Sequence, residues 1–425
     1  MKRRIAISGV GVISPIGIGL PVFWESLKSG RSGIDFISSY PTGDFPVNFA
    51  AEIKDFKAAD FVPRKAVKVM ARDIQLAVAA AKLAFDDSGL EKVSLPSERL
   101  GVSLGAGLIN ADINELGVVA GHSLNSSGQF DIKKFGEEGI RQLAPLWLLK
   151  QLPNMLSSHV SIIFNAQAPS NSVTTGCSSS LLAIGESRRV MERDQADAVI
   201  SGGADSRINP LSLLRFHLLK MLARGWTKPS QASRPFDKNR NGLVVGEGAG
   251  VIVLEELSRA RARGARIYAE LIGFGSSFSN RENSRESIAG KIQAMQAALN
   301  DAGIKKEEVD LISAHGISTL RDDLEEREAI QGLFGERAGA IPITAPKSML
   351  GYAGAACGVL GLIAALLAIR EGVIPANPNY LERDIGDHLD HVSGTPRQRE
   401  INCAMVNAFG LGGQNGVIII RKIKD

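Results

Sequence analysis

The sequence predicts an α/β protein in which two similar halves pack into one layered structure. Two observations carry this prediction: a segment close to residue 89 recurs close to residue 303, and each copy is followed by a strand, a helix and a second strand. The composition is a third observation, because 44% hydrophobic and 22% charged residues are typical of a globular protein with a large core. A chain of 425 residues suits two or three ordinary domains or one large two-part unit.

The first element expected is a strand that begins directly after Arg4. A charged start before an apolar run also resembles a signal peptide, but Gly9, Gly11 and Pro15 interrupt the run and no small-residue cleavage site follows. The two glycines also resemble part of a dinucleotide-binding loop, which Pro15 disfavours because it disrupts the helix that would receive the pyrophosphate. We therefore interpret Gly9 and Gly11 as a tight turn.

The repeated segments define the next elements. Residues 81–90, AKLAFDDSGL, resemble residues 296–304, QAALNDAGI, and Gly89 corresponds to Gly303 almost half a chain length later. Each copy has helical apolar spacing and ends at a glycine that suits a left-handed C-cap. The elements that follow are expected at residues 100–104, 178–192 and 198–201 in the first half, and at residues 309–313, 347–370 and 373–374 in the second.

The remaining regions suggest how the halves are organised. Residues 35–68 and 110–155 have no counterpart in the other half, and such insertions usually cap a site or build a subunit contact. Residues 259–266 end a basic helix and contain no linker. We therefore expect an N-terminal half, residues 1–260, and a C-terminal half, residues 261–425, within one integrated unit.

Charge and cysteine content exclude several classes of protein. The net charge of +4 is too mild to favour nucleic acid or an anionic membrane surface. Three cysteines cannot build a disulfide framework in this chain, so we expect a reducing, cytoplasmic compartment. Residues 349–369 lack charge and are long enough to span a membrane, but their glycine and alanine content favours a buried core helix. The scattered histidines predict no metal site.

Cys177 is the first candidate for chemistry. It lies in residues 173–183, VTTGCSSSLLA, at a predicted strand-to-helix junction. The N–H groups of a helix N-terminus lower the pKa of a thiol and favour a nucleophile. The alternative is a small cysteine packed in a turn, which is our interpretation of Cys357, within the buried helix, and of Cys403, beside an apolar strand.

Two loops in the second half are further candidates. His315, in residues 313–319 (SAHGIST), follows the matching strand and is expected at an accessible loop. Residues 407–416, NAFGLGGQNG, place four glycines after a strand, where backbone N–H groups can face an oxyanion. Each pattern taken alone is also compatible with an ordinary loop.

Further motifs run along the chain in a fixed order. They are residues 4–17 (RIAISGVGVISPIG), 23–25 (FWE), 30–34 (GRSGI), 175–177 (TGC), 234–242 (RPFDKNRNG), 246–250 (GEGAG) and 407–416. With these motifs the chain resembles the β-ketoacyl-acyl-carrier-protein synthases, condensing enzymes of the thiolase superfamily. The resemblance implies a thiolase-like α/β/α/β/α fold and an acyltransferase of fatty-acid or polyketide biosynthesis.

The resemblance also implies a reaction for the cysteine. Cys177 takes an acyl chain from acyl carrier protein as a thioester, and the enolate formed when malonyl carrier protein loses carbon dioxide attacks that thioester. The N–H groups of Cys177 and Leu411 form the oxyanion hole, with Gly410 and Phe409 beside it at the gate. No bound cofactor is expected, because phosphopantetheine is carried by the acyl carrier protein.

Motif matches give the other site residues their roles. His315 corresponds to the first catalytic histidine, Lys347 to the lysine that organises the site, and Glu326 to its carboxylate partner. Thr319 corresponds to a hydroxyl that binds phosphopantetheine, and Ile317 replaces a threonine with that role. The resemblance further implies a homodimer, or a heterodimer with another ketosynthase-like chain.

Tyr352 is the main departure from the pattern, because it stands where the family has its second histidine. A phenol donates a hydrogen bond but is a poor acid at neutral pH, so the decarboxylation step is the one this change affects. Three functions therefore stay open: a working condensing enzyme, a partner subunit of the chain-length-factor kind, and an acyltransferase or thioester hydrolase that loads Cys177 without decarboxylating malonate.

Overall fold

Strands and helices alternate along the chain in a computed structural model that describes residues 3–43, 45–108 and 112–423. The strands are β1 (Ile5–Ser14), β2 (Gly17–Ile18), β3 (Ile34–Phe36), β4 (Phe49–Ala51), β5 (Leu100–Ala106), β6 (Ser170–Val173), β7 (Ala198–Ser206), β8 (Glu247–Glu256), β9 (Ala269–Phe278), β10 (Leu311–Ser313), β11 (Pro342–Thr344), β12 (Val373–Ile374), β13 (Asp390–His391), β14 (Arg397–Gln398), β15 (Cys403–Phe409) and β16 (Gln414–Arg421). The helices are α1 (Leu20–Ser29), α2 (Arg64–Val67), α3 (Arg72–Ser88), α4 (Ile113–Gly121), α5 (Ile132–Glu137), α6 (Met155–Phe164), α7 (Ser179–Glu192), α8 (Pro210–Leu218), α9 (Leu257–Ala262), α10 (Ser284–Ala302), α11 (Leu320–Phe334), α12 (Lys347–Leu350) and α13 (Cys357–Glu371).

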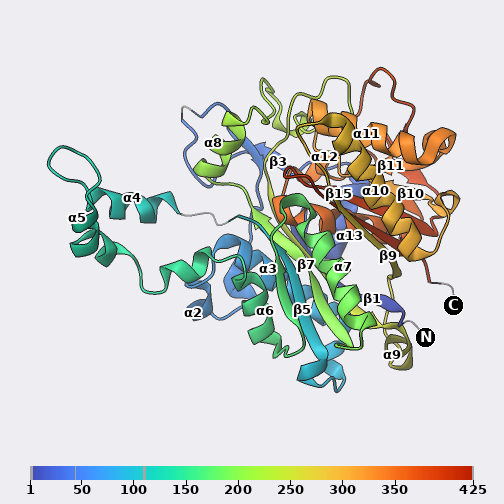
Figure 1. The fold of residues 1–425 in the computed structure, drawn as a ribbon, viewed down its shortest axis with the longest axis horizontal. Coiled ribbons are helices and arrows are strands. Elements are labelled where there is room, and N and C mark those ends of the chain that lie inside the picture. The colour runs from blue at the N-terminus through green and yellow to red at the C-terminus, as the bar shows by residue number, and fades with distance from the viewer. Residues whose placement is uncertain (1–2, 44, 109–111, 424–425) are drawn as a thin grey trace.

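One mixed sheet joins two halves of the same topology (Figure 1). In the N-terminal half β8 pairs antiparallel with β1 and β7, and β5 pairs parallel with β7 and β6. In the C-terminal half β16 pairs antiparallel with β9 and β15, and β10 pairs parallel with β15 and β11. The halves meet where β1 pairs antiparallel with β9. The predicted duplication into two halves of similar topology is confirmed.

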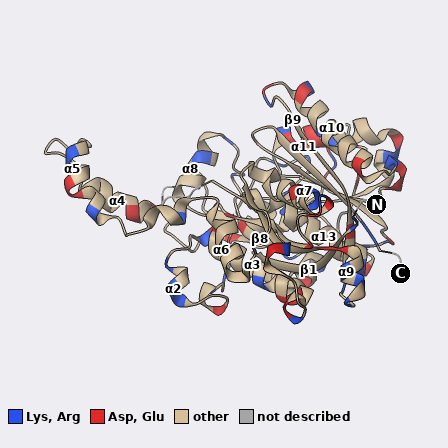
Figure 2. Cartoon of the chain, turned by 60° about the horizontal axis from the view of Figure 1, so that its bottom comes forward, with Lys and Arg blue, Asp and Glu red and all other residues tan. Residues whose placement is uncertain are grey.

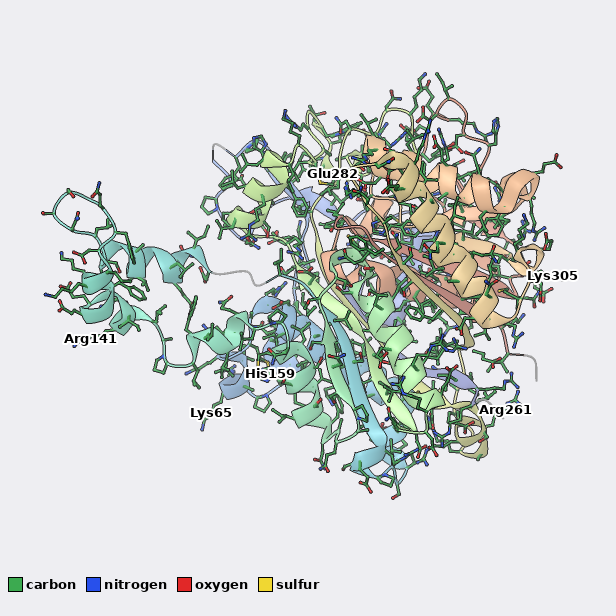
Figure 3. All side chains as sticks on the ribbon, in the orientation of Figure 1. Lys65, Arg141, His159, Arg261, Glu282 and Lys305 are labelled. Carbon is green, nitrogen blue, oxygen red and sulfur yellow. The ribbon has the colours of Figure 1, made fainter. Side chains whose placement is uncertain are left out.

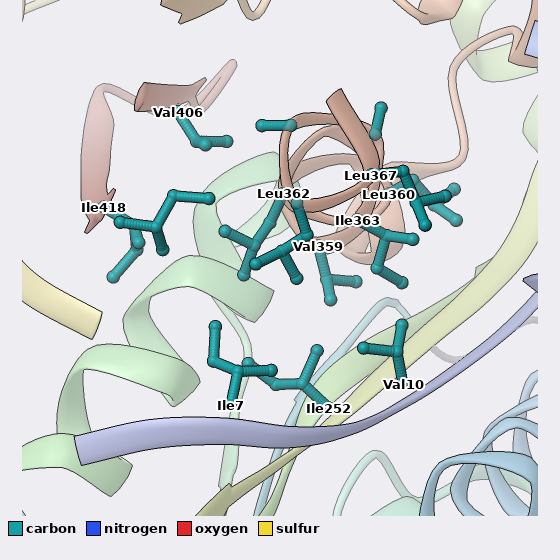
Figure 4. Close-up of a cluster of buried hydrophobic side chains, with 14 of the residues drawn as sticks. Ile7, Val10, Ile252, Val359, Leu360, Leu362, Ile363, Leu367, Val406 and Ile418 are labelled. Atoms are coloured by element: carbon teal, nitrogen blue, oxygen red, sulfur yellow. The ribbon is translucent and has the colours of Figure 1, made fainter. Parts of the chain in front are cut away.

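Helices cover both outer faces of this sheet and fill the space between its halves. Helices α3 and α6 pack on the N-terminal half, α10 with α11 beside it packs on the C-terminal half, and α7 and α13 lie between them. Figure 4 shows Val359 of α13 between Ile7 and Ile252 of one half and Val406 and Ile418 of the other. The result is the layered α/β/α/β/α structure that was predicted.

Helix α13 is apolar on all sides because it lies at the centre of the molecule. Within the described part of the chain, residues 354–371 form one helical segment long and apolar enough to cross a membrane, and 89% of it is buried inside the fold. A core helix contacts protein around its whole circumference, so it carries no polar face. The predicted buried core helix is confirmed from residue 354 onward, but residues 351–353 are not helical and separate it from α12.

Glycines let the outer helices lie directly on the sheet. Gly9 and Gly11 belong to the interior of β1, so their interpretation as a tight turn is wrong. A Cβ at these positions would lie 2.2 and 2.0 Å from carbonyl oxygens of α3. In the second half Gly273 and Gly275 of β9 meet carbonyl oxygens of α10 in the same way, at 2.5 and 2.1 Å. Close packing of helix on strand therefore accounts for these four glycines.

The predicted counterpart of the strand at residues 198–201, namely residues 373–374, is also wrong. Val373 and Ile374 form β12, which pairs with β14 in a separate two-stranded sheet. The true counterpart of β7 is β15, which pairs with β10 and β16 as β7 pairs with β5 and β8. A long connection, residues 375–402, delays this strand in the second half, and nothing in the local sequence pattern signals that delay.

An arm extends from the N-terminal half between β5 and α6, where an insertion was predicted. Residues 110–111 of that insertion lie outside the described residues. Helices α4 and α5 stand far from the sheet in Figure 1, and Figure 3 places Arg141 at the end of the arm most distant from Lys305 on the body. Several large apolar side chains of the arm are exposed, namely those of Val118, Phe130, Ile132, Ile140, Leu146 and Leu148.

Candidate active site

Cys177 lies where β6 ends and α7 begins, as predicted. A 3₁₀ turn, residues 176–178, leads directly into α7, and Gly176 opens it with a left-handed φ of 65°. The Cys177 side chain is fully buried, and its Sγ lies 2.8 Å from the Tyr352 hydroxyl oxygen. The backbone N–H of Leu411 also donates to the sulfur. The thiol therefore faces a hydroxyl, an amide and a helix N-terminus.

The electrostatics of the thiol combine opposing effects. Burial raises the pKa of Cys177, while the hydrogen bonds from Tyr352 and Leu411 and the positive charge of Lys347 lower it, and burial dominates. Burial likewise raises the pKa of Tyr352 well above its ordinary value. At neutral pH the pair is therefore a thiol beside a phenol, and both are protonated.

Tyr352 is fixed by its backbone and by one aromatic contact. Its N–H donates to the Val244 carbonyl at 2.7 Å, and its carbonyl accepts from the Gly246 N–H at 2.9 Å. Its ring lies edge-on to Phe216, with centroids 5.5 Å apart. The phenol is held against Cys177 from the segment that follows α12, which is where the departure from the family pattern was predicted to matter.

His315 follows β10 and is buried rather than accessible. Its exposed fraction is 2%, and neither ring nitrogen has a hydrogen-bond partner among the described residues. Burial, together with the charges of Lys347, Lys291 and Arg281, holds the pKa of His315 well below its ordinary value. The imidazole is neutral and has one donor and one acceptor nitrogen to offer a substrate.

Glu326 and Lys347 hold the His315 loop from its two sides. The carboxylate of Glu326 accepts from the N–H groups of His315 and Gly316 at 2.8 and 2.7 Å, and from the Asn407 side chain at 3.2 Å. The ammonium of Lys347 donates to the His315 carbonyl. In the described structure the two side chains form no direct ion pair, so the partnership predicted from the motifs runs through the His315 backbone.

The glycine-rich loop connects β15 to β16 beside the cysteine. Phe409 is buried and packs edge-on against His315, with ring centroids 6.1 Å apart. The Gly410 N–H donates to the Gln414 carbonyl at 2.6 Å and closes the turn. The turn directs the Leu411 N–H at Cys177, which is the arrangement expected of an oxyanion donor.

The two residues matched to phosphopantetheine binding have structural partners. Thr319 is the N-cap of α11, where its hydroxyl donates to the Asp322 carboxylate at 2.7 Å and accepts from the Asp322 N–H. Ile317 is 2% exposed and belongs to the apolar cluster that contains Cys177 and Tyr352. The Thr319 hydroxyl must exchange its bond to Asp322 to bind a ligand.

Several residues around the site were missed in the sequence. Asp323 accepts from the N–H groups of Ile317, Ser318 and Phe236, and burial raises its pKa to about 7. The spacing of residues along the sequence does not reveal such a role, because the role depends on where a distant loop folds. The other missed residues are Lys291 with Glu325 and Asp205 with Arg207. Cys357, interpreted as a packed cysteine, lies in the same apolar cluster as Cys177.

The helical periodicity of α10 contained a signal for the role of Lys291, because it places this lysine on the buried face. It lies one helical turn after Ser287 and one before Met295, on the buried face of α10. A lysine on an apolar face needs a partner, and Lys291 donates to Glu325 and to Ser287 at 2.8 Å. With His315 and Phe409 it lines a cavity of about 10 Å³, the size of one water molecule.

A much larger cavity lies away from this chemistry. It measures about 1240 Å³ and lies between the base of the arm, residues 112–115 and 150–153, and the body of the N-terminal half. Neither Cys177 nor His315 lines it. The reactive groups therefore occupy a tight, buried site rather than this large cavity.

Sequence comparison identifies the family of this arrangement. Residues 2–260 match the family Beta-ketoacyl synthase, N-terminal domain, and residues 268–381 match Beta-ketoacyl synthase, C-terminal domain. The chain belongs to the β-ketoacyl synthase family. The predicted identity as a condensing enzyme of this family, and the thiolase-like fold it implies, are confirmed.

Individual relatives match from end to end. The chain is 36% identical to 3-oxoacyl-[acyl-carrier-protein] synthase 2 of Coxiella burnetii, with 100% of each chain covered. It is 34% identical to the enzyme of the same name from Vibrio harveyi, again over 100% of each.

Solved structures of ketosynthases are also similar. One titled as the ishigamide ketosynthase/chain length factor has a TM-score of 0.85 and 31% identity, with 100% of both chains covered. A β-ketoacyl synthase from Burkholderia phymatum has a TM-score of 0.88 and 28% identity, covering 99% of this chain and 100% of the other. A third, with a TM-score of 0.84, 27% identity and full coverage of both chains, is a type II polyketide ketosynthase in complex with its acyl carrier protein.

Proposed function

We propose that this β-ketoacyl synthase condenses an acyl chain held on Cys177 with malonyl carrier protein. The observation that carries the proposal is the placement of Cys177 Sγ at the start of α7, beside the Leu411 N–H. The Cys177 thiol gives up its proton as its sulfur attacks the acyl thioester carbonyl, and the two N–H groups of the oxyanion hole stabilise the negative oxygen. The proton passes to the phosphopantetheine sulfur as the bond from the acyl carbon to that sulfur breaks. The phosphopantetheine thiol then leaves, and the acyl group stays on sulfur.

The second half reaction uses the neutral groups of the site. Malonyl carrier protein loses carbon dioxide, and the electron pair of the broken carbon–carbon bond becomes an enolate. The imidazole of His315 and the phenol of Tyr352 donate hydrogen bonds to the enolate oxygen. The enolate carbon then attacks the acyl carbonyl on Cys177, the carbon–sulfur bond breaks, and the Cys177 thiolate is released with the 3-oxoacyl product on the carrier protein.

The strongest competing function is acyl transfer without decarboxylation. The observation that favours it is the neutral phenol of Tyr352, whose pKa lies well above 10 because the ring is buried. A phenol cannot bring to a developing enolate the positive charge that a protonated imidazole brings. A role as partner subunit is supported by the likeness to a structure titled ketosynthase/chain length factor.

The partner proteins follow from the same proposal. Acyl carrier protein delivers both substrates on its own phosphopantetheine, so the enzyme needs no bound cofactor. Lys and Arg residues are interspersed with Asp and Glu along the chain in Figure 2, and the net charge of +4 is compatible with an acidic carrier. This proposal places the enzyme in the cytoplasm.

A second copy of the chain is the proposed cover for the arm. Phe130 and Ile132 on the arm are 60% and 73% exposed, and a monomer rarely leaves so many large apolar side chains in water. Strand β6 also ends the sheet with a free edge in the described structure. We therefore propose a homodimer, with a heterodimer with another ketosynthase-like chain as the alternative.

Carbon dioxide release from malonyl carrier protein tests the proposed function. We expect release by the wild type, loss of release in His315→Ala with the acyl adduct on Cys177 retained, and faster release in Tyr352→His. Intact mass spectrometry after incubation with acyl carrier protein measures the adduct, and Cys177→Ala is its control. An adduct without any release would favour the acyltransferase. Neither signal, with co-purification of another ketosynthase, would favour the partner subunit.

A further inference from the structure

Arg207 is a buried guanidinium at the edge of the sheet where Cys177 lies. It follows β7 directly, and its side chain is 8% exposed. Its Nη2 lies 2.7 Å from the carboxylate of Asp205, which is fully buried. Its Nε has no hydrogen-bond partner among the described residues. A buried cation with an unused donor is costly unless it faces an anion that forms at some stage.

The backbone places Arg207 next to Tyr352. The Arg207 N–H donates to the Gly246 carbonyl at 3.2 Å, and the Gly246 N–H donates to the Tyr352 carbonyl at 2.9 Å. The segment after Tyr352 then folds over the guanidinium. A Cβ at Gly354 would lie 2.9 Å from the Arg207 Nε, and the Ala355 N–H donates to Asp205 at 2.9 Å. One carboxylate thus fixes both the arginine and the start of α13.

The charged and titratable groups around the Cys177–Tyr352 pair belong to four elements. They are Lys347 on α12, the thiol of Cys357 on α13, Asp205 and Arg207 at the end of β7, and Asp73 on α3, which faces Asp205 and Arg207. The positive charge of Arg207 lowers the pKa of both the Cys177 thiol and the Tyr352 phenol. Asp205 offsets part of that charge.

We propose that Arg207 is a positioning residue that stabilises the anion formed when the Cys177–Tyr352 pair loses a proton. The proposal rests on the proposed function, in which Cys177 is the nucleophile. A tyrosine at position 352 cannot take up a positive charge as a histidine there can, so the site needs another cation to favour the thiolate. The permanent charge of Arg207 supplies it, at a position the family resemblance did not indicate.

The pH dependence of thiol alkylation tests this role. Iodoacetamide forms a bond to the Cys177 sulfur and releases iodide, and its rate follows the thiolate fraction. Peptide mass spectrometry reports modification at Cys177 separately from Cys357 and Cys403. We expect Arg207→Gln to raise the midpoint by about one pH unit and to lower the rate at neutral pH about tenfold. Arg207→Lys, which keeps the charge, restores most of the rate.

Two further variants separate this effect from damage to the fold. Asp205→Asn keeps the size of the side chain and removes the negative charge, so it shifts the midpoint downward, opposite to Arg207→Gln. Arg188→Gln removes an equally buried arginine, one that pairs with Glu192 at 3.0 Å on α7, and leaves the midpoint unchanged. An unchanged midpoint in Arg207→Gln would overturn the proposal, as would shifts in one direction for Arg207→Gln and Asp205→Asn.

The alkylation test needs no carrier protein, so it fails independently of the proposed function. If the wild type releases no carbon dioxide while Arg207→Gln shifts the alkylation midpoint, decarboxylative condensation is wrong and the role of Arg207 stands. If the wild type condenses and the midpoint stays fixed in Arg207→Gln, the role of Arg207 is wrong and the function stands.

Discussion

The two halves share one topology but use the start of their inner helix differently. In each half a 3₁₀ turn that opens with a left-handed glycine, Gly176 or Gly354, leads into the inner helix. The position in the second turn that corresponds to Cys177 is Ala355, and Cys357 follows two residues later. Both thiols are buried, and burial raises the pKa of Cys357 to about 12.

The difference lies in what the opposite half contributes. Cys177 receives the Tyr352 hydroxyl, the Leu411 N–H and the charge of Lys347, all of which belong to the C-terminal half. Cys357 also receives the charge of Lys347, but its hydrogen bond comes from the backbone of Ala353, and both groups belong to its own half. A cysteine at a helix start therefore becomes a nucleophile in this fold only where the other half supplies hydrogen-bond donors and a cation.

The largest expected effect comes from replacing each of the two cysteines by alanine. Cys177→Ala removes the sulfur that forms the acyl bond, so we expect condensation to fall at least ~10³-fold and the acyl adduct to disappear. Cys357→Ala leaves the adduct intact and lowers turnover less than about fivefold, since burial keeps its thiol protonated, with a pKa of about 12. Intact mass spectrometry and carbon dioxide release measure both variants. An adduct that survives in Cys177→Ala would contradict the assignment of the nucleophile.

Stability measurements on the glycines under α3 and α10 test whether the two halves pack their outer helices in the same way. Gly11→Ala would place a Cβ 2.0 Å from a carbonyl oxygen of α3, and Gly275→Ala would place one 2.1 Å from a carbonyl oxygen of α10. We expect each to lower the free energy of unfolding by about 3 kcal/mol, because backbone must move to make room. Urea unfolding measures this.

Gly136→Ala on the arm is the matched control for the two glycine variants. A Cβ there meets nothing within 4 Å, so we expect unchanged or slightly increased stability. Equal, small effects at all three positions would show that helix contact does not explain the glycines in β1 and β9.

The smallest effect concerns acid stability in the C-terminal half. Lys291, Ser287 and Arg321 lower the pKa of Glu325 from 4.5 to about 2, against the opposing effect of burial. A lowered pKa stabilises the fold above pH 4.5, and this stabilisation is lost as pH falls from 4.5 to about 2. We expect Glu325→Gln to lower the free energy of unfolding by about 2 kcal/mol at pH 7, with a smaller deficit at pH 3.

The N-terminal half supplies the control for this ion pair. Lys82 and Asp86 form an exposed pair on α3 at 3.5 Å, so Asp86→Asn should change stability by less than about 0.5 kcal/mol at either pH. Urea unfolding at the two pH values measures all three proteins. A deficit in Glu325→Gln that is the same at pH 3 and pH 7 would contradict the role of the Glu325 charge.

Sequence reasoning located the main site residues because each lies at the end of a recognisable element. His315 follows a strand with a local apolar pattern, Cys177 lies among small residues before a helix, and Leu411 lies in a loop marked by glycines. It misplaced the strand counterpart at Val373 and Ile374, because a connection of unpredictable length precedes β15. It also paired Lys347 with Glu326 directly, although each bonds to a different group of the His315 backbone.

The sequence by itself determined the duplicated α/β order and the buried helix, because periodicity and glycine caps are local properties of the chain. Motif matches to the family predicted Cys177 as the nucleophile and His315 as the first histidine. Only the tertiary structure decided which groups tune them. Arg207 lies beside Tyr352 through the backbone of Gly246, and Lys291 reaches His315 from a neighbouring helix. Those contacts join residues far apart in the chain, and their energies depend on burial, which arises only when the two halves close on each other.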